Sequence, residues 1–507
     1  MLSIIDAGAP PRCPADFNLA AYVLAPAAAQ PDHAALLMID PEGADCWSYA
    51  RLAKAVLGTG TGLRARGLAP GARVLMRLGN SYDFPVTFLG AIAAGLVPVP
   101  TSALLTAPEI AKLCAEVAPD LIVAAPDVAL PPEPPCPVVT LEEARGWHRL
   151  APCVPEVGDP DRPAYVVYTS GTSGRPRGVV HAHRAVWARR MMQRGWTGLG
   201  PGDRLLHAGA FNWTFTLGTG LLDPWGIGAT ALIPAPGVTP AQLPLLLRRH
   251  EATVLAAAPG VFRQMLRQTA RMDLPALRHG LSAGEKMPAT TRAAWTASTG
   301  TMVHEAFGMS EISTFLSGSP ERPAPEGTAG FAQPGRCIAI LGADGRPVPR
   351  GTPGVLAVHR RDPGLFLGYL GAAEETAARF TGDWFLTGDQ AAMDAAGAVT
   401  YLGRDDDMMN AGGVRVSPLE VEAVLDAHPE IRESAACEAP VKADVTVIAA
   451  FYVADRDIPE FELAAWAAER LARYKQPRLW CRVPELPRGA NNKLLRRALR
   501  ATLGGSS

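Results

Sequence analysis

The chain has 507 residues, of which 48% are hydrophobic and 19% are charged, and its formal net charge is −1. This length exceeds one compact core and predicts about two to four lobes. The near-neutral charge argues against nucleic acid and against an anionic membrane surface as partners. The eight cysteines are scattered without a Cys-x-x-Cys pair, which argues against a zinc site and a disulfide framework and favours a reducing cytoplasm.

Through the first two thirds of the chain, short apolar runs alternate with helical patterns. The longest apolar run begins at Phe88 and is interrupted by Pro98 and Pro100. It therefore predicts a buried helix that runs into a strand rather than a membrane span. The alternation predicts layered α/β sheets whose strands are largely parallel. Predicted strands cover residues 72–79, 119–125, 162–170 and 229–235, and a helix is predicted over 81–95.

A string rich in glycine and hydroxyl groups, Tyr-Thr-Ser-Gly-Thr-Ser-Gly-Arg-Pro-Arg-Gly, occupies residues 168–178 at the end of a predicted strand. A helix is predicted over residues 179–193 behind it. A strand, a loop with free amides and hydroxyls, and a helix together favour phosphate binding. The Walker spacing is missing, so a P-loop ATPase is not expected. Taken alone, the string is also compatible with an ordinary glycine–serine turn.

The last third of the chain differs in composition. Turn residues separate short apolar runs over 341–361, which predicts a small antiparallel sheet or barrel. Three consecutive acids predict a hinge at 404–407, so we expect domains at 1–403 and 404–507. The elements predicted for the smaller, α+β domain are a helix that starts at Pro418 behind a capping Ser417, a strand over 443–454 and a helix over 460–475.

The string at 168–178 resembles the signature of the adenylate-forming superfamily, which comprises acyl-CoA synthetases, non-ribosomal adenylation domains and luciferases. Ser173 stands in place of a threonine of that signature and Arg177 in place of its lysine, so the hydroxyl and the positive charge are kept. Arginine is a wider, rigid fork, so its phosphate geometry need not copy that of lysine. Segments that resemble the other motifs follow in the superfamily's order at 281–288, 305–311, 385–390, 402–408, 410–422 and 486–500.

The resemblance implies an α/β (mixed α+β) fold. A large N-terminal domain of layered α/β sheets with a small β-barrel-like part would precede a small, mobile α+β C-terminal domain. The implied catalytic residues are Lys493, Glu311 and Arg177, and Glu311 and Thr169 are the implied ligands of Mg²⁺. The residues implied to bind ATP or coenzyme A are Thr169, Ser170, Gly171, Thr172, Ser173, Gly174, Ser282, Ala283, Gly284, Glu285, Ala306, Phe307, Gly308, Met309, Ser310, Asp389, Arg404, Gly412 and Gly413.

Four of these residues have distinct implied roles at the nucleotide. Phe307 would stack on adenine, and Ser310 would reach the α-phosphate. Asp389 would accept hydrogen bonds from both ribose hydroxyls, which suits the two acceptor oxygens of a carboxylate. Arg404 would serve the ribose and phosphate side.

The C-terminal motifs imply a second group of roles. Lys493 would bridge the incoming carboxylate and the α-phosphate, with Asn492 in place of the usual glycine. Gly412 and Gly413 would lie beside the pantetheine tunnel, where glycine allows a ligand to approach the backbone closely. Asp406 occupies the hinge position about which family members rotate the small domain between the half-reactions.

Phe211, Asn212, Trp213 and Gly308 align with the walls of the superfamily's acyl pocket. Amino-acid-activating relatives carry an aspartate at the position of Asn212, so a neutral asparagine argues against amino acids. Gly308 stands where acetate-specific relatives carry a blocking tryptophan, which predicts a floor open to larger acids. Trp213 and Phe215 are expected to line an apolar or aromatic slot. The pattern is most similar to benzoate-type and medium-chain ligases.

The implied reaction is ATP-dependent activation of an aromatic or medium-size apolar carboxylic acid, with Mg²⁺, to an acyl-adenylate. Thioester formation with coenzyme A would follow, with release of AMP and pyrophosphate. We therefore expect a cytoplasmic acid–thiol ligase, monomeric or homodimeric, without nucleic-acid or membrane partners. Two alternatives stay open: a free-standing adenylation enzyme that loads a carrier protein, and an inactive nucleotide-binding homologue, which the departures Arg177 and Asn492 motivate.

Overall fold

The structure is a computed structural model, and it describes residues 1–169, 177–268, 271–404, 407–411, 414–442, 445–471, 473–489 and 494–503. The chain divides into two compact units. The major unit comprises Ile5–Ile338 and Val358–Phe385, and the minor unit comprises Met1–Ile4, Ala339–Ala357 and Leu386–Ser507. The predicted domain boundary between residues 403 and 404 stays a prediction. None of the described helices is long and apolar enough to cross a membrane.

A sheet of nine strands in the order β16-β15-β14-β13-β12-β10-β11-β2-β3 forms the centre of the major unit. The six strands from β14 to β2 in this order run parallel, whereas β15, β16 and β3 at the two sides of the sheet are antiparallel to their neighbours. The inner strands are buried along almost their whole length, as expected for parallel strands covered on both faces. The strands are β2 (Ala34–Ile39), β3 (Ala44–Ser48), β10 (Arg204–His207), β11 (Thr230–Pro234), β12 (Val254–Ala256), β13 (His279–Ala283), β14 (Met302–Met309), β15 (Ser313–Ser317) and β16 (Phe331–Ala332).

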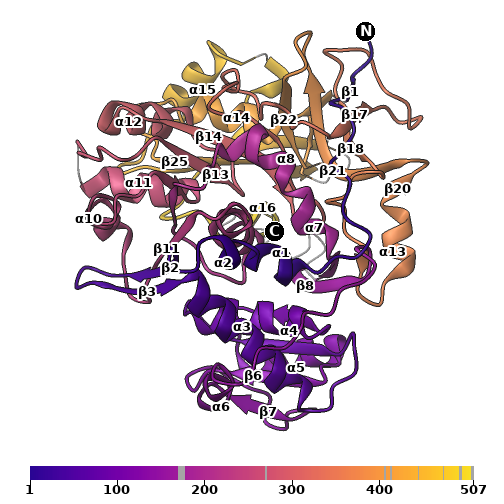
Figure 1. The fold of residues 1–507 in the computed structure, drawn as a ribbon. Coiled ribbons are helices and arrows are strands. Elements are labelled where there is room, and N and C mark those ends of the chain that lie inside the picture. The colour runs from indigo at the N-terminus through magenta and orange to yellow at the C-terminus, as the bar shows by residue number, and fades with distance from the viewer. Residues whose placement is uncertain are drawn as a thin grey trace. The chain divides into compact units, whose positions relative to one another are not determined.

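A second parallel sheet, in the order β5-β4-β6-β7, lies among the helices α3 to α6 (Figure 1). Its elements confirm the strands predicted over 72–79 and 119–125 and the helix predicted over 81–95. The apolar run from Phe88 is the end of α4 followed by β5, as predicted. The elements are β4 (Arg73–Arg77), β5 (Val97–Pro100), β6 (Leu121–Ala124), β7 (Val138–Thr140), α3 (Tyr49–Arg64), α4 (Asp83–Ala93), α5 (Ala107–Val117) and α6 (Leu141–Trp147).

The described residues on either side of the glycine-rich string pair as antiparallel strands, and the string is followed by a strand and not by a helix. β8 (Pro163–Thr169) pairs antiparallel with β9 (Arg177–Ala182), and β19 (Gly368–Tyr369) continues the sheet beyond β9. The helix predicted over 179–193 is therefore wrong for its first residues. Valines of β8 and β9 lie opposite each other, and β-branched side chains favour such pairing. A helix N-terminus directly behind the string is thus not available for phosphate.

Two π-helical segments occur in the described part of the major unit. η1 (Gln193–Thr197) follows α7 (Arg184–Ala188) and α8 (Arg190–Met192), and η2 (Thr216–Leu222) passes directly into α9 (Asp223–Ile227). Segments of this kind are rare and are found frequently at functional sites. The other helices of the unit are α1 (Leu19–Leu24), α2 (Pro26–Ala29), α10 (Leu243–Arg249), α11 (Pro259–Gln268), α12 (Ala289–Thr299) and α13 (Ala373–Ala378), with the short 3₁₀ turn η3 (Pro240–Gln242).

The turn-rich segment over 341–361 contributes to an open sheet, in agreement with the antiparallel sheet predicted there. Six strands have the order β1-β17-β18-β21-β20, with β22 paired to β21. β21 is antiparallel to β20 and to β22, and its Asp389 lies opposite Arg404 of β22. The strands are β1 (Ile4–Asp6), β17 (Cys337–Leu341), β18 (Gly354–His359), β20 (Phe380–Thr381), β21 (Trp384–Met393) and β22 (Val399–Arg404).

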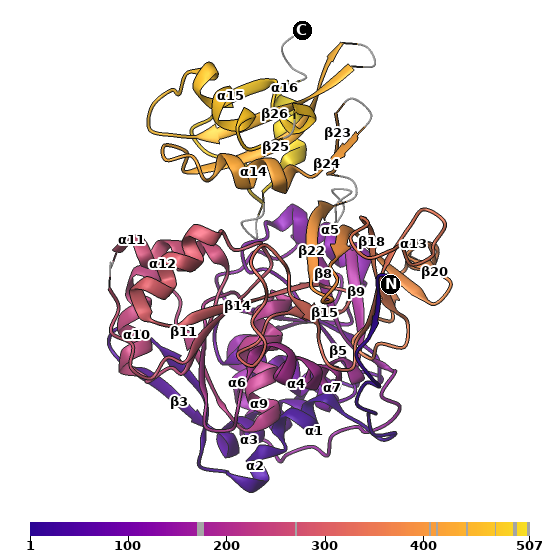
Figure 2. The ribbon, with the colours of Figure 1, turned by 90° about the horizontal axis from the view of Figure 1, so that it is seen from above.

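The C-terminal part of the minor unit is α+β, as predicted. Figure 2 shows α14, α15 and α16 beside β25 and β26. The predicted start of α14 is confirmed, with Ser417 at the N-cap position and Pro418 in the first turn. The Ser417 hydroxyl does not cap the helix but donates a hydrogen bond to the Leu402 carbonyl. The elements are β23 (Met409–Ala411), β24 (Val414–Val416), α14 (Pro418–Leu425), β25 (Glu433–Lys442), β26 (Val445–Val453), α15 (Glu460–Ala468), the 3₁₀ turn η4 (Arg473–Lys475), β27 (Leu479–Arg482) and α16 (Arg496–Leu503).

Candidate active site

Two of the predicted nucleotide motifs lie side by side on neighbouring parallel strands. Ser282 and Ala283 of β13 lie opposite Glu305 and Ala306 of β14. Phe307 follows on β14 and is partly exposed, as a ring that stacks on a ligand must be. The carboxyl ends of parallel strands are the usual edge at which α/β sheets bind ligands. The structure thus brings together the two segments predicted to contact adenine.

The chain turns sharply after β14, and this turn carries Ser310 and Glu311. Glu311 is only 8% exposed, and its Oε1 accepts a hydrogen bond of 2.7 Å from the Tyr369 hydroxyl. Burial, together with the charge of Glu311, raises the pKa of Tyr369, so the phenol remains a donor. Ser313 closes the turn in the left-handed region, with φ of 68°. The carboxylate is therefore held in a fixed position beside the residue predicted to reach the α-phosphate.

The donor set around Glu311 fits Mg²⁺. Tyr369 occupies only Oε1, and Oε2 has no partner among the described residues. Mg²⁺ at nucleotide sites is commonly bound by one or two carboxylates together with substrate phosphates, so a single buried carboxylate is sufficient. No group of three or more His, Cys, Asp or Glu side chains that could hold a metal is found in the described part of the chain. Thr169, the second predicted ligand, ends β8 opposite Arg177.

Gly308 lies where two strands approach each other closely, and its role at the floor of the acyl pocket stays a prediction. The backbone has a bulge between Phe307 and Gly308, and Gly308 lies opposite Thr314 of β15. A Cβ atom on Gly308 would lie 2.2 Å from the carbonyl oxygen of Ser313 and 2.5 Å from Cα of Thr314. The position therefore lacks a side chain because β14 and β15 approach each other closely there.

Trp213 lies against Gly284, so a predicted pocket residue meets the predicted adenine segment. Gly284 has φ of 93°, and a Cβ atom on it would lie 2.7 Å from Cζ2 of Trp213. Ser282 in the same segment is fully buried, and its hydroxyl has no partner among the described residues. A buried hydroxyl without a partner is expected to bind water or a ligand.

The remaining acyl-pocket predictions fall on residues of different exposure. Phe211 is buried and packs on Phe84 with ring centroids 5.3 Å apart, whereas Asn212 is partly exposed. Phe215 is buried beside Trp196 in the core. None of these residues lines the two cavities described below. The assignment of Phe211, Asn212 and Trp213 to the acyl pocket stays a prediction.

Arg177 forms an ion pair within the major unit. Its Nε lies 2.7 Å from the carboxylate of Glu375, which precedes Thr376 in α13. The hydrogen bond with Glu375 raises the pKa of Arg177. The arginine predicted to hold pyrophosphate therefore has a carboxylate partner with which a phosphate would compete.

In the minor unit, the two residues predicted to bind the ribose contact each other. Nη1 of Arg404 lies 3.2 Å from Oδ1 of Asp389 and donates to the carbonyl of Thr387 at 3.1 Å. Asp389 is 3% exposed, and its backbone N–H donates to the Thr387 hydroxyl. The arginine thus orients the carboxylate that is expected to accept hydrogen bonds from the ribose.

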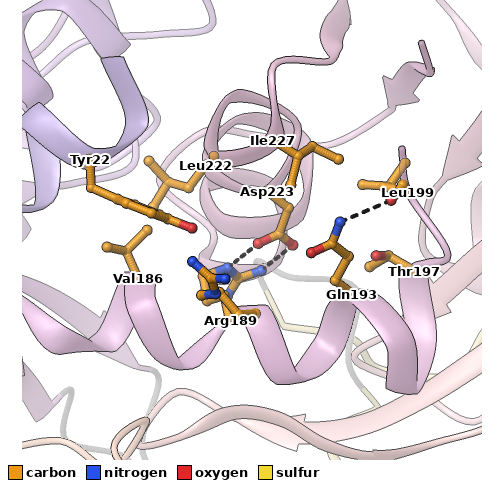
Figure 3. A pocket seen from close by; sticks show the side chains of 11 residues that line it. Tyr22, Val186, Arg189, Gln193, Thr197, Leu199, Leu222, Asp223 and Ile227 are labelled. Atoms are coloured by element: carbon orange, nitrogen blue, oxygen red, sulfur yellow. Dashed lines mark hydrogen bonds and ion pairs between the residues drawn. The ribbon is translucent and has the colours of Figure 1, made fainter. Parts of the chain in front are cut away.

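Two cavities lie on either side of one buried ion pair in the major unit. The first, which we call the Ser310 cavity, has a free volume of about 20 Å³ for water-sized groups and is lined by Tyr165, His181, Arg189, Gly218, Ser310 and Ser313, with Thr214, Leu217 and Leu222. The second, the Tyr22 cavity, has a free volume of about 20 Å³ as well, and Figure 3 shows its lining side chains, among them Tyr22, Val186, Gln193 and Asp223. Arg189 and Leu222 line both cavities. The slot predicted for Trp213 and Phe215 stays a prediction, because neither residue lines either cavity.

The ion pair joins Arg189, between α7 and α8, to Asp223, at the start of α9 (Figure 3). Nε and Nη2 of Arg189 lie 2.5 and 2.7 Å from the two carboxylate oxygens of Asp223. Nη1 donates to the Ser313 hydroxyl at 2.7 Å, and Nη2 also donates to the Thr219 hydroxyl at 3.2 Å. Both side chains are at most 10% exposed.

No motif points to Arg189 and Asp223, although the sequence carries one signal of their burial. Arg189 occupies the same helical face as Ala185 and Val186, which are buried, and the helical period predicts the same for it. An arginine at a core-facing position requires a partner, since an unpaired buried charge is costly. That partner lies 34 residues further along the chain.

Several predicted site residues lie outside the described part of the chain. They are Ser170, Gly171, Thr172, Ser173 and Gly174 of the glycine-rich string, Asp406 of the hinge, Gly412 and Gly413, and Lys493 with its neighbour Asn492.

Comparisons with known proteins agree with these motifs over most of the chain. The AMP-binding enzyme family matches residues 24–370, and the AMP-binding enzyme C-terminal domain matches residues 420–493. The benzoate–CoA ligase of Thauera aromatica is 30% identical over 91% of this chain and 92% of its own length. The 3-hydroxybenzoate–CoA/4-hydroxybenzoate–CoA ligase of the same organism is 30% identical over 90% of this chain and 92% of its own length.

A solved structure gives the same result for the fold. The crystal structure of ATP-bound MatB from Rhodopseudomonas palustris has a TM-score of 0.85 and 27% sequence identity to this protein, and the match covers 96% of this chain and 99% of that chain. The chain therefore belongs to the AMP-binding enzyme family, as an acyl-CoA synthetase of the adenylate-forming superfamily.

Proposed function

We propose that this enzyme activates a small carboxylic acid, aromatic or of medium chain length, and transfers its acyl group to coenzyme A. The observation that carries the proposal is the turn of Ser310 and Glu311. It follows directly on the paired strands that hold the predicted adenine segment, and Ser310 lines a cavity. The relatives named for benzoate and hydroxybenzoate support an aromatic acid.

In the first half-reaction, a carboxylate oxygen of the acid attacks the α-phosphorus of ATP. The bond from the α-phosphorus to the bridging oxygen of the β-phosphate breaks, and pyrophosphate leaves. Because two anions must meet, the enzyme has to supply positive charge and alignment. Lys493 is proposed to bridge the carboxylate and the α-phosphate, and Arg177 is proposed to hold the departing pyrophosphate after exchanging Glu375 for it.

The described residues contribute orientation. The Ser310 hydroxyl would donate to an α-phosphate oxygen, Phe307 would stack on adenine, and Asp389 would accept from the ribose hydroxyls. Glu311, held by Tyr369, would bind Mg²⁺, which when bound shares the charge of the phosphates. These roles rest on the motif positions and on the contacts given above.

In the second half-reaction, the sulfur of coenzyme A attacks the acyl carbon of the adenylate. The bond from that carbon to the phosphate oxygen breaks, AMP leaves, and the thiol proton passes to solvent. Gly412 and Gly413 are proposed to flank the pantetheine arm. We also propose a cytoplasmic location, since all eight cysteines are described and none forms a disulfide.

The direct test of adenylate formation is exchange of labelled pyrophosphate into ATP without coenzyme A. We expect exchange that depends on both an acid and Mg²⁺, because only a reversible acyl-adenylate step returns pyrophosphate to ATP. Exchange that is independent of any acid, or no exchange with any aromatic or medium-chain acid, would contradict the proposal.

A further inference from the structure

The Ser310 cavity adjoins the turn of Ser310 and Glu311, so it would receive part of the acid if the proposed function is correct. Its free volume for water-sized groups is about 20 Å³, which is enough for one small polar group such as a hydroxyl. It therefore suits the polar end of an acid whose remaining atoms lie outside the cavity. Polar residues among those that line it are Tyr165, His181, Arg189, Ser310 and Ser313. Some of their donors and acceptors have no partner among the described residues, and an acid with only hydrocarbon beyond its carboxylate would leave them so.

Arg189 presents the strongest donor in this wall. Of its five N–H donors, Asp223 takes two, and Thr219 and Ser313 take one each. The second N–H of Nη1 has no partner among the described residues. Nη1 is also the nitrogen that contacts Ser313, itself a residue of the cavity wall. A donor is therefore available beside the cavity.

The surrounding backbone makes room for this guanidinium. A Cβ atom on Gly218 would lie 2.4 Å from Cζ of Arg189, so any larger residue would displace the arginine. Gly218 belongs to the π-helical η2, and Asp223 is the first residue after it. The absence of a side chain at Gly218 thus leaves the space that the Arg189 guanidinium occupies.

The charge of the pair indicates which kind of group it can bind. Burial alone would lower the pKa of Arg189, but the charge and hydrogen bonds of Asp223 outweigh it and the pKa is raised. The guanidinium is thus protonated and already neutralised by Asp223. A second carboxylate on the substrate would add a buried charge without a counter-charge, whereas a neutral hydroxyl would not.

Tyr165 and His181 supply complementary groups. No described residue forms a hydrogen bond with the Tyr165 hydroxyl. Nε2 of His181 lies 2.7 Å from the Ser310 carbonyl and must donate to it, so Nδ1 is an acceptor, and it is buried without a partner among the described residues. Burial lowers the pKa of His181 to about 4, so the ring is neutral. The wall therefore offers both donors and acceptors, which is what a hydroxyl group requires.

We propose that Arg189, held in place by Asp223, and Tyr165 bind a hydroxyl group at the end of the acid remote from its carboxylate, so that the preferred substrates are hydroxylated small acids. The hydroxyl oxygen accepts from Arg189, and its proton is shared with Tyr165. Arg189 and Tyr165 are then specificity-determining residues of the acyl pocket. This proposal rests on the proposed function.

The test compares acids that differ only in the hydroxyl group. The full chain is assayed for thioester formation with ATP, Mg²⁺ and coenzyme A, using benzoate against 3- and 4-hydroxybenzoate and hexanoate against 6-hydroxyhexanoate. For at least one pair we expect kcat/KM to favour the hydroxylated acid by about 10-fold or more, as a hydrogen bond to a charged group permits. In the double variant Arg189→Met/Asp223→Leu the two acids should be used nearly equally, mainly through loss of the hydroxylated one. Apolar replacement of a whole buried ion pair often preserves stability.

Two further variants separate recognition from folding. Arg336→Met/Asp362→Leu makes the same change at another fully buried pair, which lines neither cavity, and should keep the preference. Tyr165→Phe removes only the hydroxyl and should reduce the preference without changing the melting temperature. A preference for unsubstituted acids, or one that survives both Tyr165→Phe and the Arg189 double variant, would overturn the inference while leaving the ligase activity established. Failure of every acid to support adenylate formation would overturn both proposals.

Discussion

The Tyr369 hydroxyl donates a hydrogen bond of 2.7 Å to Oε1 of Glu311, so a residue of β19 fixes the carboxylate that follows β14. The two residues are 58 positions apart in the chain. This contact leaves Oε2 available to another partner and restricts the Glu311 side chain to one rotamer. The pairing of β19 with β9 therefore helps to position the carboxylate that is expected to bind Mg²⁺.

Glu311→Gln should therefore lower acid-dependent pyrophosphate release by about 100-fold or more, because charge stabilisation at the phosphates is lost. The requirement for Mg²⁺ should shift to higher concentration. Tyr369→Phe is the matched control, since it keeps the carboxylate and removes only its positioning bond. A Glu311→Gln enzyme with unchanged Mg²⁺ dependence would show that this carboxylate does not bind the metal.

Asp389→Asn should raise the KM for ATP by about 10-fold or more, because one charged acceptor for the ribose is lost. The kcat should fall less than kcat/KM, since the residue acts on binding. Kinetics with ATP and with 2′-deoxy-ATP provide the measurement, and the variant should discriminate less between the two nucleotides than the wild type. If the variant and the wild type discriminate equally between ATP and 2′-deoxy-ATP, Asp389 does not bind the ribose 2′-hydroxyl.

Glu375→Gln should release Arg177 from its ion pair. The pair is partly exposed, so its loss is worth little to stability and we expect the KM for ATP to fall by at most about fivefold. Arg177→Ala should have the opposite effect and weaken ATP binding. A higher KM in Glu375→Gln would show that this glutamate positions Arg177 for phosphate rather than competing with it.

Lys493→Ala should lower adenylate formation by about 100-fold or more, because the bridge between two anions is removed. Thioester formation from supplied acyl-adenylate and coenzyme A should be largely kept. The two half-reactions are measured separately, by pyrophosphate exchange and by release of AMP. Equal losses in both would contradict the role proposed for this lysine.

Glu305 predicts a pH dependence of stability. Burial raises its pKa from 4.5 to about 7, although the ion pair with Arg292 acts in the opposite direction. Between about pH 4.5 and pH 7 the folded state holds a proton that the unfolded state has lost, so stability decreases as the pH rises through this window. Glutamine does not titrate, so Glu305→Gln should not show this decrease of stability with pH. The melting temperature of the variant minus that of the wild type should therefore be larger at pH 8 than at pH 5. A constant difference would contradict the raised pKa.

Local patterns predict much of the fold and of the nucleotide motifs. β4, α4 and β6 follow from apolar periodicity, whereas the adjacency of β13 and β14 is known only from their pairing in the structure. β9 does not follow from its own sequence, because residues 179–193 also fit a helical period, and only pairing with β8 selects the strand. Tertiary contacts decide such segments.

The acyl side of the site depends more on contacts between distant residues. The lack of space beside Gly308 is set by the bulge in β14 and by the backbone of β15, which no motif encodes. The placement of Arg189 in the wall of the Ser310 cavity depends on its contacts with Asp223 and Ser313, which lie 34 and 124 positions away in the chain. A motif gives the kind of residue at a position, but the shape and polarity of a cavity arise from several segments at once.

Acid-dependent pyrophosphate release with ATP and Mg²⁺ is the decisive measurement, across aromatic, short and medium-chain acids, each with and without coenzyme A. We expect release that is stimulated by small aromatic or medium-chain acids and sustained over many turnovers only when coenzyme A is present, with equimolar AMP and acyl-CoA as products. Release that stops after one turnover in the presence of coenzyme A would indicate a carrier protein as the acceptor. The absence of release with every acid would contradict the assignment of this chain as an active ligase.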